Sequence, residues 1–221
     1  MNDNLYSTEI VCPVCSKKFM VTKIKKKALK VERRDTDFCV YYKEINPLFY
    51  DAWVCENCGF AAQADKFYDI TGKEAEVLLK KLTPKWNKRS LEGERSADAA
   101  IEAFKLVLLN HQLRAVKSSE LAKVCLRIAW LYRTKEDARE HDFIKFTLKY
   151  YLETYENERF PVDKLDESTC MYMIGELNRR VGNYGEAAKW LSRVISSPAA
   201  RRNPALMEAV RDQFQLVKDK L

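Results

Sequence analysis

The sequence predicts an α+β protein that is mainly α-helical, in which a small β domain built around four cysteines precedes an antiparallel array of helices. Two Cys-x-x-Cys pairs lie within the first 60 residues, at a spacing typical of metal-binding knuckles. From about residue 70 onward, apolar residues recur at the three- and four-residue intervals of amphipathic helices. We expect a cysteine domain over 1–70, a connecting helix and linker over 71–95, and a helical domain over 96–221.

The composition indicates a globular protein outside the membrane. The chain has 221 residues, of which 47% are hydrophobic and 32% charged, which is ordinary for a folded domain. Its N-terminus lacks the basic and apolar regions of a secretory signal, and no window approaches the ~18 uninterrupted apolar residues of a membrane span. Seven cysteines without such a signal indicate reduced thiols, so we expect a cytoplasmic protein with no membrane partner.

The two cysteine pairs predict a zinc ribbon. Two residues between the cysteines of each pair let both sulfurs occupy corners of one tetrahedron around Zn²⁺. Four thiolates close the coordination sphere, so the expected zinc is structural rather than catalytic. The only histidines, His111 and His141, lie in the helical half, and we expect both on the surface rather than at the metal. The predicted metal ligands are Cys12, Cys15, Cys55 and Cys58.

Between the knuckles, the alternation of residues from Phe19 to Arg34 predicts a β-hairpin with a charged tip, and Trp53-Val54 a further strand. This basic hairpin is a candidate for nucleic-acid contact through its lysines. The formal net charge is +7, but residues 1–70 hold 11 basic and 10 acidic side chains, so a solvated hairpin edge is the competing interpretation. The candidate contacts are Lys23, Lys25, Lys26 and Lys27 within the stretch Lys17–Arg34.

Start and stop signals divide the rest of the chain into helices. Thr71-Gly72 opens a helix that Pro84 stops, and residues 84–95 form the expected linker. Ser96 is a predicted N-cap, as is Asn203 with Pro204 at the first helical position. Apolar spacing marks the helices between these caps, over about 121–132, 143–157 and 170–181.

The segment from Gly175 to Pro198 follows the tetratricopeptide pattern of a small residue, a glycine turn, tyrosine, alanine and a closing proline. Gly175 and Ala187 are small where two antiparallel helices must approach, and Gly182-Asn183 makes the turn. Stacked repeats form extended binding surfaces, so we expect a protein or peptide partner on the concave face. By repeat register, the residues that project toward this face are Tyr172, Glu176, Arg179 and Arg180.

Three segments carry a resemblance to a known family. Arg34-Asp35-Thr36-Asp37-Phe38-Cys39, Asn46-Pro47 and the stretch Trp53–Ala62 around the second knuckle together resemble a bacterial family catalogued as a domain of unknown function, number 2225. The resemblance covers nearly the whole chain. It implies a zinc ribbon joined to tetratricopeptide-like helices in a bacterial cytoplasmic protein, and it implies no particular activity.

The polar-aromatic insert between the knuckles is the second candidate for partner binding, through Arg34, Asp35, Asp37, Tyr41 and Tyr42. The simpler interpretation of Asp35-Thr36-Asp37 is a salt-bridged turn, and that of Cys39 a small buried hydrophobe rather than an extra ligand or redox thiol.

We therefore expect a non-enzymatic zinc-binding adaptor whose helical repeats bind a protein partner, with no small-molecule substrate evident. The alternatives are a nucleic-acid- or ribosome-associated factor using the basic hairpin and, third, a zinc-thiolate redox sensor.

Overall fold

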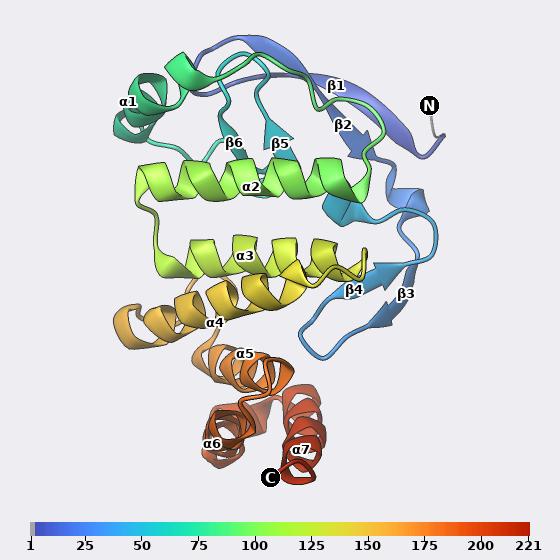
Figure 1. The fold of residues 1–221 in the computed structure, drawn as a ribbon, viewed down its shortest axis with the longest axis vertical. Coiled ribbons are helices and arrows are strands. Elements are labelled where there is room, and N and C mark those ends of the chain that lie inside the picture. The colour runs from blue at the N-terminus through green and yellow to red at the C-terminus, as the bar shows by residue number, and fades with distance from the viewer. Residues whose placement is uncertain (1–2) are drawn as a thin grey trace. The chain divides into compact units, whose positions relative to one another are not determined.

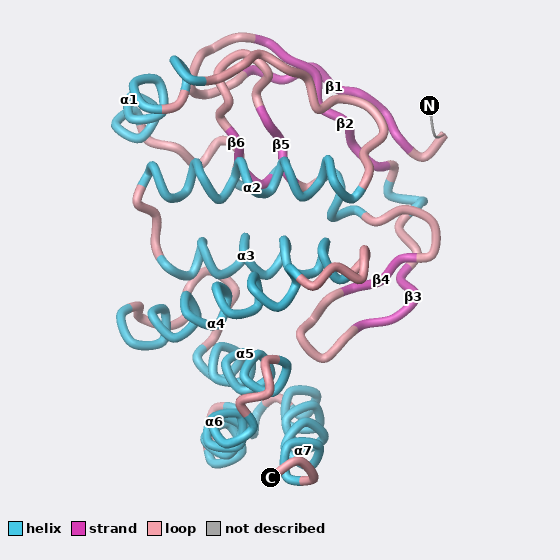
Figure 2. The backbone as a smooth tube through the Cα atoms, viewed as in Figure 1, coloured by secondary structure: helices cyan, strands magenta, loops and turns pink. Residues whose placement is uncertain are grey.

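The structure is a computed structural model that describes residues 3–221, whose helices and strands are drawn in Figures 1 and 2. These residues form two units. Unit 1 comprises the described residues up to Arg34 together with Val40–Val116 and Trp130–Glu140. Unit 2 comprises Asp35–Cys39, Lys117–Ala129 and His141–Leu221. The three two-stranded antiparallel ladders belong to unit 1 and most of the helices to unit 2.

The first ladder pairs β1 (Leu5–Val11) with β2 (Lys18–Ile24), with Val11 opposite Lys18. The first cysteine knuckle is thus the turn of this hairpin. The predicted hairpin over Phe19–Arg34 is wrong, because the lysine run that was expected at its tip forms a short 3₁₀ turn, Lys26–Ala28. The chain then enters β3 (Val31–Arg34), which pairs with β4 (Val40–Tyr42) instead.

The third ladder pairs β5 (Ala52–Val54) with β6 (Ala61–Gln63) around the second knuckle, which confirms the strand expected at Trp53-Val54. Its side chains join a core centred on Phe67, which is fully buried. The Phe67 ring lies 5.0 Å from that of Phe60, 5.5 Å from Trp53 and 5.9 Å from Phe19. Both hairpins that carry the knuckles therefore share one apolar centre.

Two helices complete unit 1. A capping box between Thr71 and Glu74 starts α1 (Gly72–Lys81), and the Ser96 hydroxyl accepts from Ala99 N–H to start α2 (Ala97–Arg114) as predicted. α2 packs along β5 and β6 (Figure 1). Its buried residues include His111, which is only 5% exposed. The surface position expected for this histidine is wrong, because the last turns of α2 also lie against the core; His141 is exposed as expected.

The expected linker over 84–95 packs against the strands and turns of unit 1 that precede it. Gly93 N–H donates to the Thr22 hydroxyl at 2.7 Å. The buried Arg95 guanidinium donates to the carbonyls of Phe49 (3.1 Å) and Ala52 (2.7 Å). Unit 1 consequently runs on through α2 to Val116, a division that differs from the predicted boundaries at residues 70 and 95.

Unit 2 holds four complete or nearly complete helices and most of a fifth. α3 (Ser118–Arg133) ends in unit 1, and α4 (Arg139–Asn157) begins there. α5 (Glu167–Arg180) packs on α6 (Tyr184–Ser196), and α6 on α7 (Pro204–Lys218). Asn203 caps α7 by accepting from Leu206 N–H, as predicted. Within the described residues, no helix is long and apolar enough to cross a membrane.

Candidate metal centre

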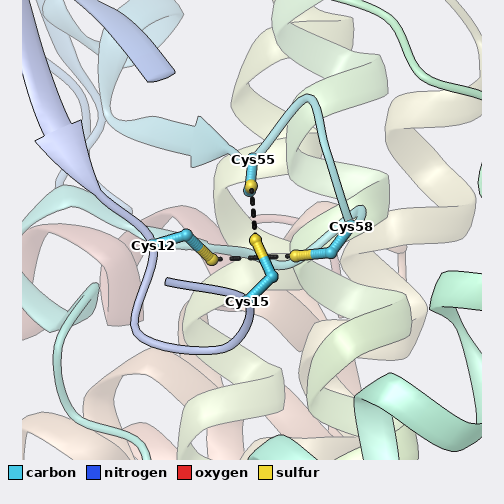
Figure 3. Close-up of side chains that lie close together, drawn as sticks. All are labelled: Cys12, Cys15, Cys55 and Cys58. Carbon is cyan, nitrogen blue, oxygen red and sulfur yellow. Dashed lines mark hydrogen bonds between the residues drawn. The ribbon is translucent and has the colours of Figure 1, made fainter. Parts of the chain in front are cut away.

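Four cysteine sulfurs converge in unit 1 from the turns of two different hairpins (Figure 3). All four Sγ atoms lie within 4.8 Å of one another. Across the knuckles, Cys12 Sγ lies 3.7 Å from Cys58 Sγ, and Cys15 Sγ 3.7 Å from Cys55 Sγ. Cys15 is half-buried and the other three are buried. The prediction that these four cysteines lie together is confirmed, and they form a group compatible with a metal ion.

Each knuckle is closed by a residue in the left-handed region directly after its second cysteine. Ser16 has φ 58° and Gly59 has φ 78°. Ser16 N–H donates to Cys12 C=O and Gly59 N–H to Cys55 C=O. A serine in this conformation is less favourable than a glycine by roughly 1 kcal/mol, so the first knuckle is the more strained of the two.

Three side chains from residues 83–110 hold the second knuckle by its carbonyl groups. Trp86 Nε1 donates to Glu56 C=O at 2.7 Å, Thr83 Oγ1 to Cys58 C=O at 3.2 Å and the buried Asn110 Nδ2 to Gly59 C=O at 3.2 Å. Sequence reasoning missed these residues because they lie 25 to 51 positions away from their partners. The available signal was Trp86 itself, since tryptophan in a linker is rarely left in solvent.

Hydrogen bonding among the thiols separates their pKa values. Bonds from Cys12 and then Cys58 hold the pKa of Cys55 well below its ordinary value. The bond with Cys55 raises the pKa of Cys12, and the bond with Cys12 raises that of Cys58, with burial adding to both. One thiolate is therefore stabilised at the expense of the others. A bound divalent cation would remove this conflict, because it neutralises the charge that the buried sulfurs cannot carry together.

The candidate nucleic-acid lysines lie on two elements, the strand β2 and the 3₁₀ turn after it, rather than at the tip of one hairpin. Lys23 lies on β2 with its Nζ 4.9 Å from the centre of the Trp53 ring. Lys25, Lys26 and Lys27 are exposed on and beside the 3₁₀ turn that follows. Nearby lysines are paired with acids, as in Lys30–Glu44 at 2.7 Å.

The candidate partner residues of the insert and of α5 meet each other inside unit 2. The turn Asp35–Cys39 lies on α5, where Thr36 Oγ1 donates to Glu176 Oε1 at 2.6 Å and Tyr172 Oη donates to Thr36 C=O at 2.8 Å. Arg180 Nη2 lies 2.9 Å from Asp35 Oδ1 and 3.6 Å from Asp37 Oδ1. A salt-bridged turn is thus present, but the partner that the structure shows is Arg180 of α5 rather than the flanking Arg33 and Arg34.

Opposite charges pair within this cluster of the turn and α5. Glu176 and Asp37 are fully buried, and Arg179 and Arg180 both donate to the Glu176 carboxylate at 2.7–2.8 Å. The hydrogen bond with Glu176 raises the pKa of Arg179. Burial, followed by the nearby Glu176 charge, raises the pKa of Tyr172. Tyr172 is also fully buried, and its ring packs against the Phe38 ring with their centroids 5.5 Å apart.

The remaining candidates of the insert lie on the β3–β4 ladder of unit 1. Arg34 is exposed on β3, and Tyr41 and Tyr42 are half-buried on β4. The Arg33 guanidinium covers the Tyr41 ring at 3.4 Å from its centre. Cys39 is only 4% exposed, as expected for a small hydrophobe, and does not belong to the four-sulfur group.

Comparison with known proteins identifies a family and nothing closer. Residues 5–217 match a family described as an uncharacterized protein conserved in bacteria, domain of unknown function number 2225. No curated protein and no solved structure matches the chain. Since the match spans nearly all of the sequence, the chain belongs to this bacterial family.

Proposed function

We propose that this protein is a non-enzymatic, zinc-binding adaptor of the bacterial cytoplasm that binds a protein partner through a tetratricopeptide-like helical unit. The observation that carries the proposal is the contact between α5 and α6. A Cβ atom placed on Gly175 would lie 2.8 Å from Leu191 Cδ2, so a larger residue would have to displace the Leu191 side chain. The tetratricopeptide pattern calls for a small residue at such a helix–helix contact, and stacked repeats of this kind present binding surfaces.

Zinc is the metal that the donor set fits best. Four cysteine sulfurs from two Cys-x-x-Cys knuckles supply a tetrahedral, soft coordination sphere with no corner left for a water nucleophile. The metal would hold unit 1 together, and the ribbon would offer the adaptor a second contact surface. Seven free cysteines suit a reducing compartment.

The test is purification of tagged protein from its native host, with and without nuclease. A partner protein that remains bound after nuclease treatment supports the adaptor. Metal analysis of the same preparation should find about one zinc per chain, the ratio expected for one four-thiolate site. Loss of every partner with nuclease would contradict the proposal.

The second candidate, nucleic-acid binding, is favoured by one observation: Lys25, Lys26 and Lys27 are exposed side by side. Replacing the three with glutamine gives the matched variant for the purification. If the partners are nucleic-acid dependent, this variant loses them even without nuclease, whereas the adaptor retains them. The third candidate, a redox sensor, draws on the 3.7 Å separation of sulfurs across the knuckles.

A further inference from the structure

Unit 2 contains an open groove between one face of α4 and the turn that joins α5 to α6. Its volume is ≈ 410 Å³, enough for one or two large side chains. The α4 residues that line it recur at the intervals expected for one helix face. The lining residues are His141, Lys145, Leu148, Lys149 and Leu152 of α4, with Val181 and Asn183 of the turn.

The floor of this groove is apolar and its charged rim is entirely basic. Leu148, Leu152 and Val181 form the floor, and none of the described residues that line the groove is acidic. Lys149 Nζ has one nearby carboxylate, Glu153 at 3.8 Å. Lys145 and His141 are exposed and have no ion-pair or hydrogen-bond partner among residues 3–221. The rim therefore carries positive charge that the protein leaves largely uncompensated.

Backbone groups at the turn do not offset this charge. The carbonyls of Leu177, Asn178 and Arg179 at the end of α5 accept hydrogen bonds from Val181, Asn183 and Gly182 N–H respectively. The following helix α6 begins at this turn. Its N-cap residue, Asn183, lines the groove and makes no side-chain capping hydrogen bond. An uncapped helix N-terminus adds positive potential, in the same sense as the lysines.

The α5 face that the repeat register singles out is covered by the chain itself. Tyr172 and Glu176 are fully buried beneath the turn Asp35–Cys39. A partner that approaches unit 2 thus meets the α4 groove as an open recess, whereas the α5 face is already occupied.

We infer that the α4 groove binds an acidic peptide segment that carries a large apolar side chain, the apolar group entering over Leu148 and Leu152 and the carboxylates pairing with Lys145 and Lys149. This inference rests on the proposed adaptor function and names the partner chemistry and the place where it binds. Apolar burial supplies affinity, and the basic rim selects against neutral and basic segments.

The test uses fluorescence anisotropy of the full-length protein with three dye-labelled synthetic peptides. The first has a Leu-Leu pair flanked by aspartates, the second replaces the leucines with serines, and the third replaces the aspartates with lysines. We expect only the first to bind wild-type protein measurably. Because an exposed charge pair contributes up to about 1 kcal/mol, Lys145→Glu should weaken binding of the first peptide about fivefold.

A matched variant and a charge swap separate the groove from general electrostatics. Lys164→Glu reverses an exposed lysine that does not line the groove and should leave the affinity unchanged. Lys145→Glu should in turn gain affinity for the lysine-flanked peptide. Its fold should persist, since the introduced carboxylate would precede Lys149 by one helical turn, a favourable pair.

The inference is overturned if Lys145→Glu and Lys164→Glu weaken binding equally, or if the serine peptide binds as well as the leucine peptide. It is also overturned if the first peptide does not bind. In each case the purification experiment still reports independently on the adaptor. If Lys145→Glu retains a nuclease-resistant partner, the adaptor function is supported and the α4 groove is excluded as its binding site.

Discussion

Replacing Gly59 with alanine should destabilise the second knuckle, because it adds both backbone strain and a steric clash. Gly59 has φ 78°, a conformation that costs a non-glycine residue about 1–2 kcal/mol. Its added Cβ would lie 2.7 Å from Cδ2 and Cε3 of Trp86. That ring is fixed by the hydrogen bond from Trp86 Nε1 to Glu56 C=O, so it cannot move away without losing the bond. Overpacking of this kind costs about 1–3 kcal/mol, which gives a total of about 2–5 kcal/mol.

Gly93 provides the matched control for the backbone part of this cost. It also lies in unit 1, has φ 91°, and has no atom within 4 Å of an added Cβ. Gly93→Ala should therefore cost only the conformational part, about 1–2 kcal/mol, which is the lower part of the Gly59→Ala effect. In a Trp86→Ala background the clash is removed, so Gly59→Ala should fall to the same value as the control.

The assay is hydrogen–deuterium exchange of peptides that cover β5 and β6, on the protein as purified. Exchange reports the free energy of local opening, so Gly59→Ala should accelerate it strongly and Gly93→Ala only modestly. Peptides from α5 and α6 in unit 2 serve as an internal reference. Equal acceleration by the two alanines, or no rescue by Trp86→Ala, would refute the view that Trp86 buttresses the knuckle.

Three further predictions test other parts of the fold. Gly175→Ala should destabilise unit 2 by about 1–3 kcal/mol in urea denaturation, because its Cβ would meet Leu191 at 2.8 Å; an unchanged midpoint would contradict this. Cys55→Ser, or a strong chelator, should remove the metal and unfold the ribbon while circular dichroism keeps the signal of the α4–α7 helices; full ribbon protection without metal would contradict it. Burial raises the pKa of Glu74, but hydrogen bonds from Thr71 and Arg114 outweigh it and lower the pKa overall below 4.5. The resulting stabilisation is present above pH 4.5 and lost as the pH falls through the lowered pKa, so a gap of up to about 1 kcal/mol between wild type and Glu74→Gln, which loses the ion pair with Arg114, should close on acidification.

Local signals in the sequence predicted local features well. The caps at Ser96 and Asn203 and each Cys-x-x-Cys pair were readable, because each depends on residues within a few positions of one another. The pairing of the strands around the cysteines was not readable in this way. Whether β2 pairs backward with β1 or forward with β3 depends on the knuckle acting as a turn, and the alternation within β2 is the same in both cases.

Contacts between distant segments account for the rest. The side chains of Asn110 and Trp86 donate hydrogen bonds to carbonyls of the second knuckle. Because every residue has a backbone carbonyl, the residue type of the acceptor does not reveal such a bond. His111 is buried because it continues the buried face of α2, four residues after Val107 and seven after Phe104. Helical spacing places Glu176 and Arg180 one turn apart on α5, but it could not identify the chain's own turn as the segment covering them.

That turn also indicates where a partner has room to bind. Asp37 and Glu176 are fully buried, with Arg179 and Arg180 as charge partners of the cluster. Removing one side of such a buried pair typically costs about 3–5 kcal/mol, because the remaining charge is left without compensation. A competing peptide would have to replace the hydrogen bond from Thr36 as well as the carboxylates, against a segment that is already attached to the chain. The cost of exposing this cluster favours a partner that leaves it intact. The α4 groove makes no such demand, because its Lys145 has no acidic partner within the described part of the chain.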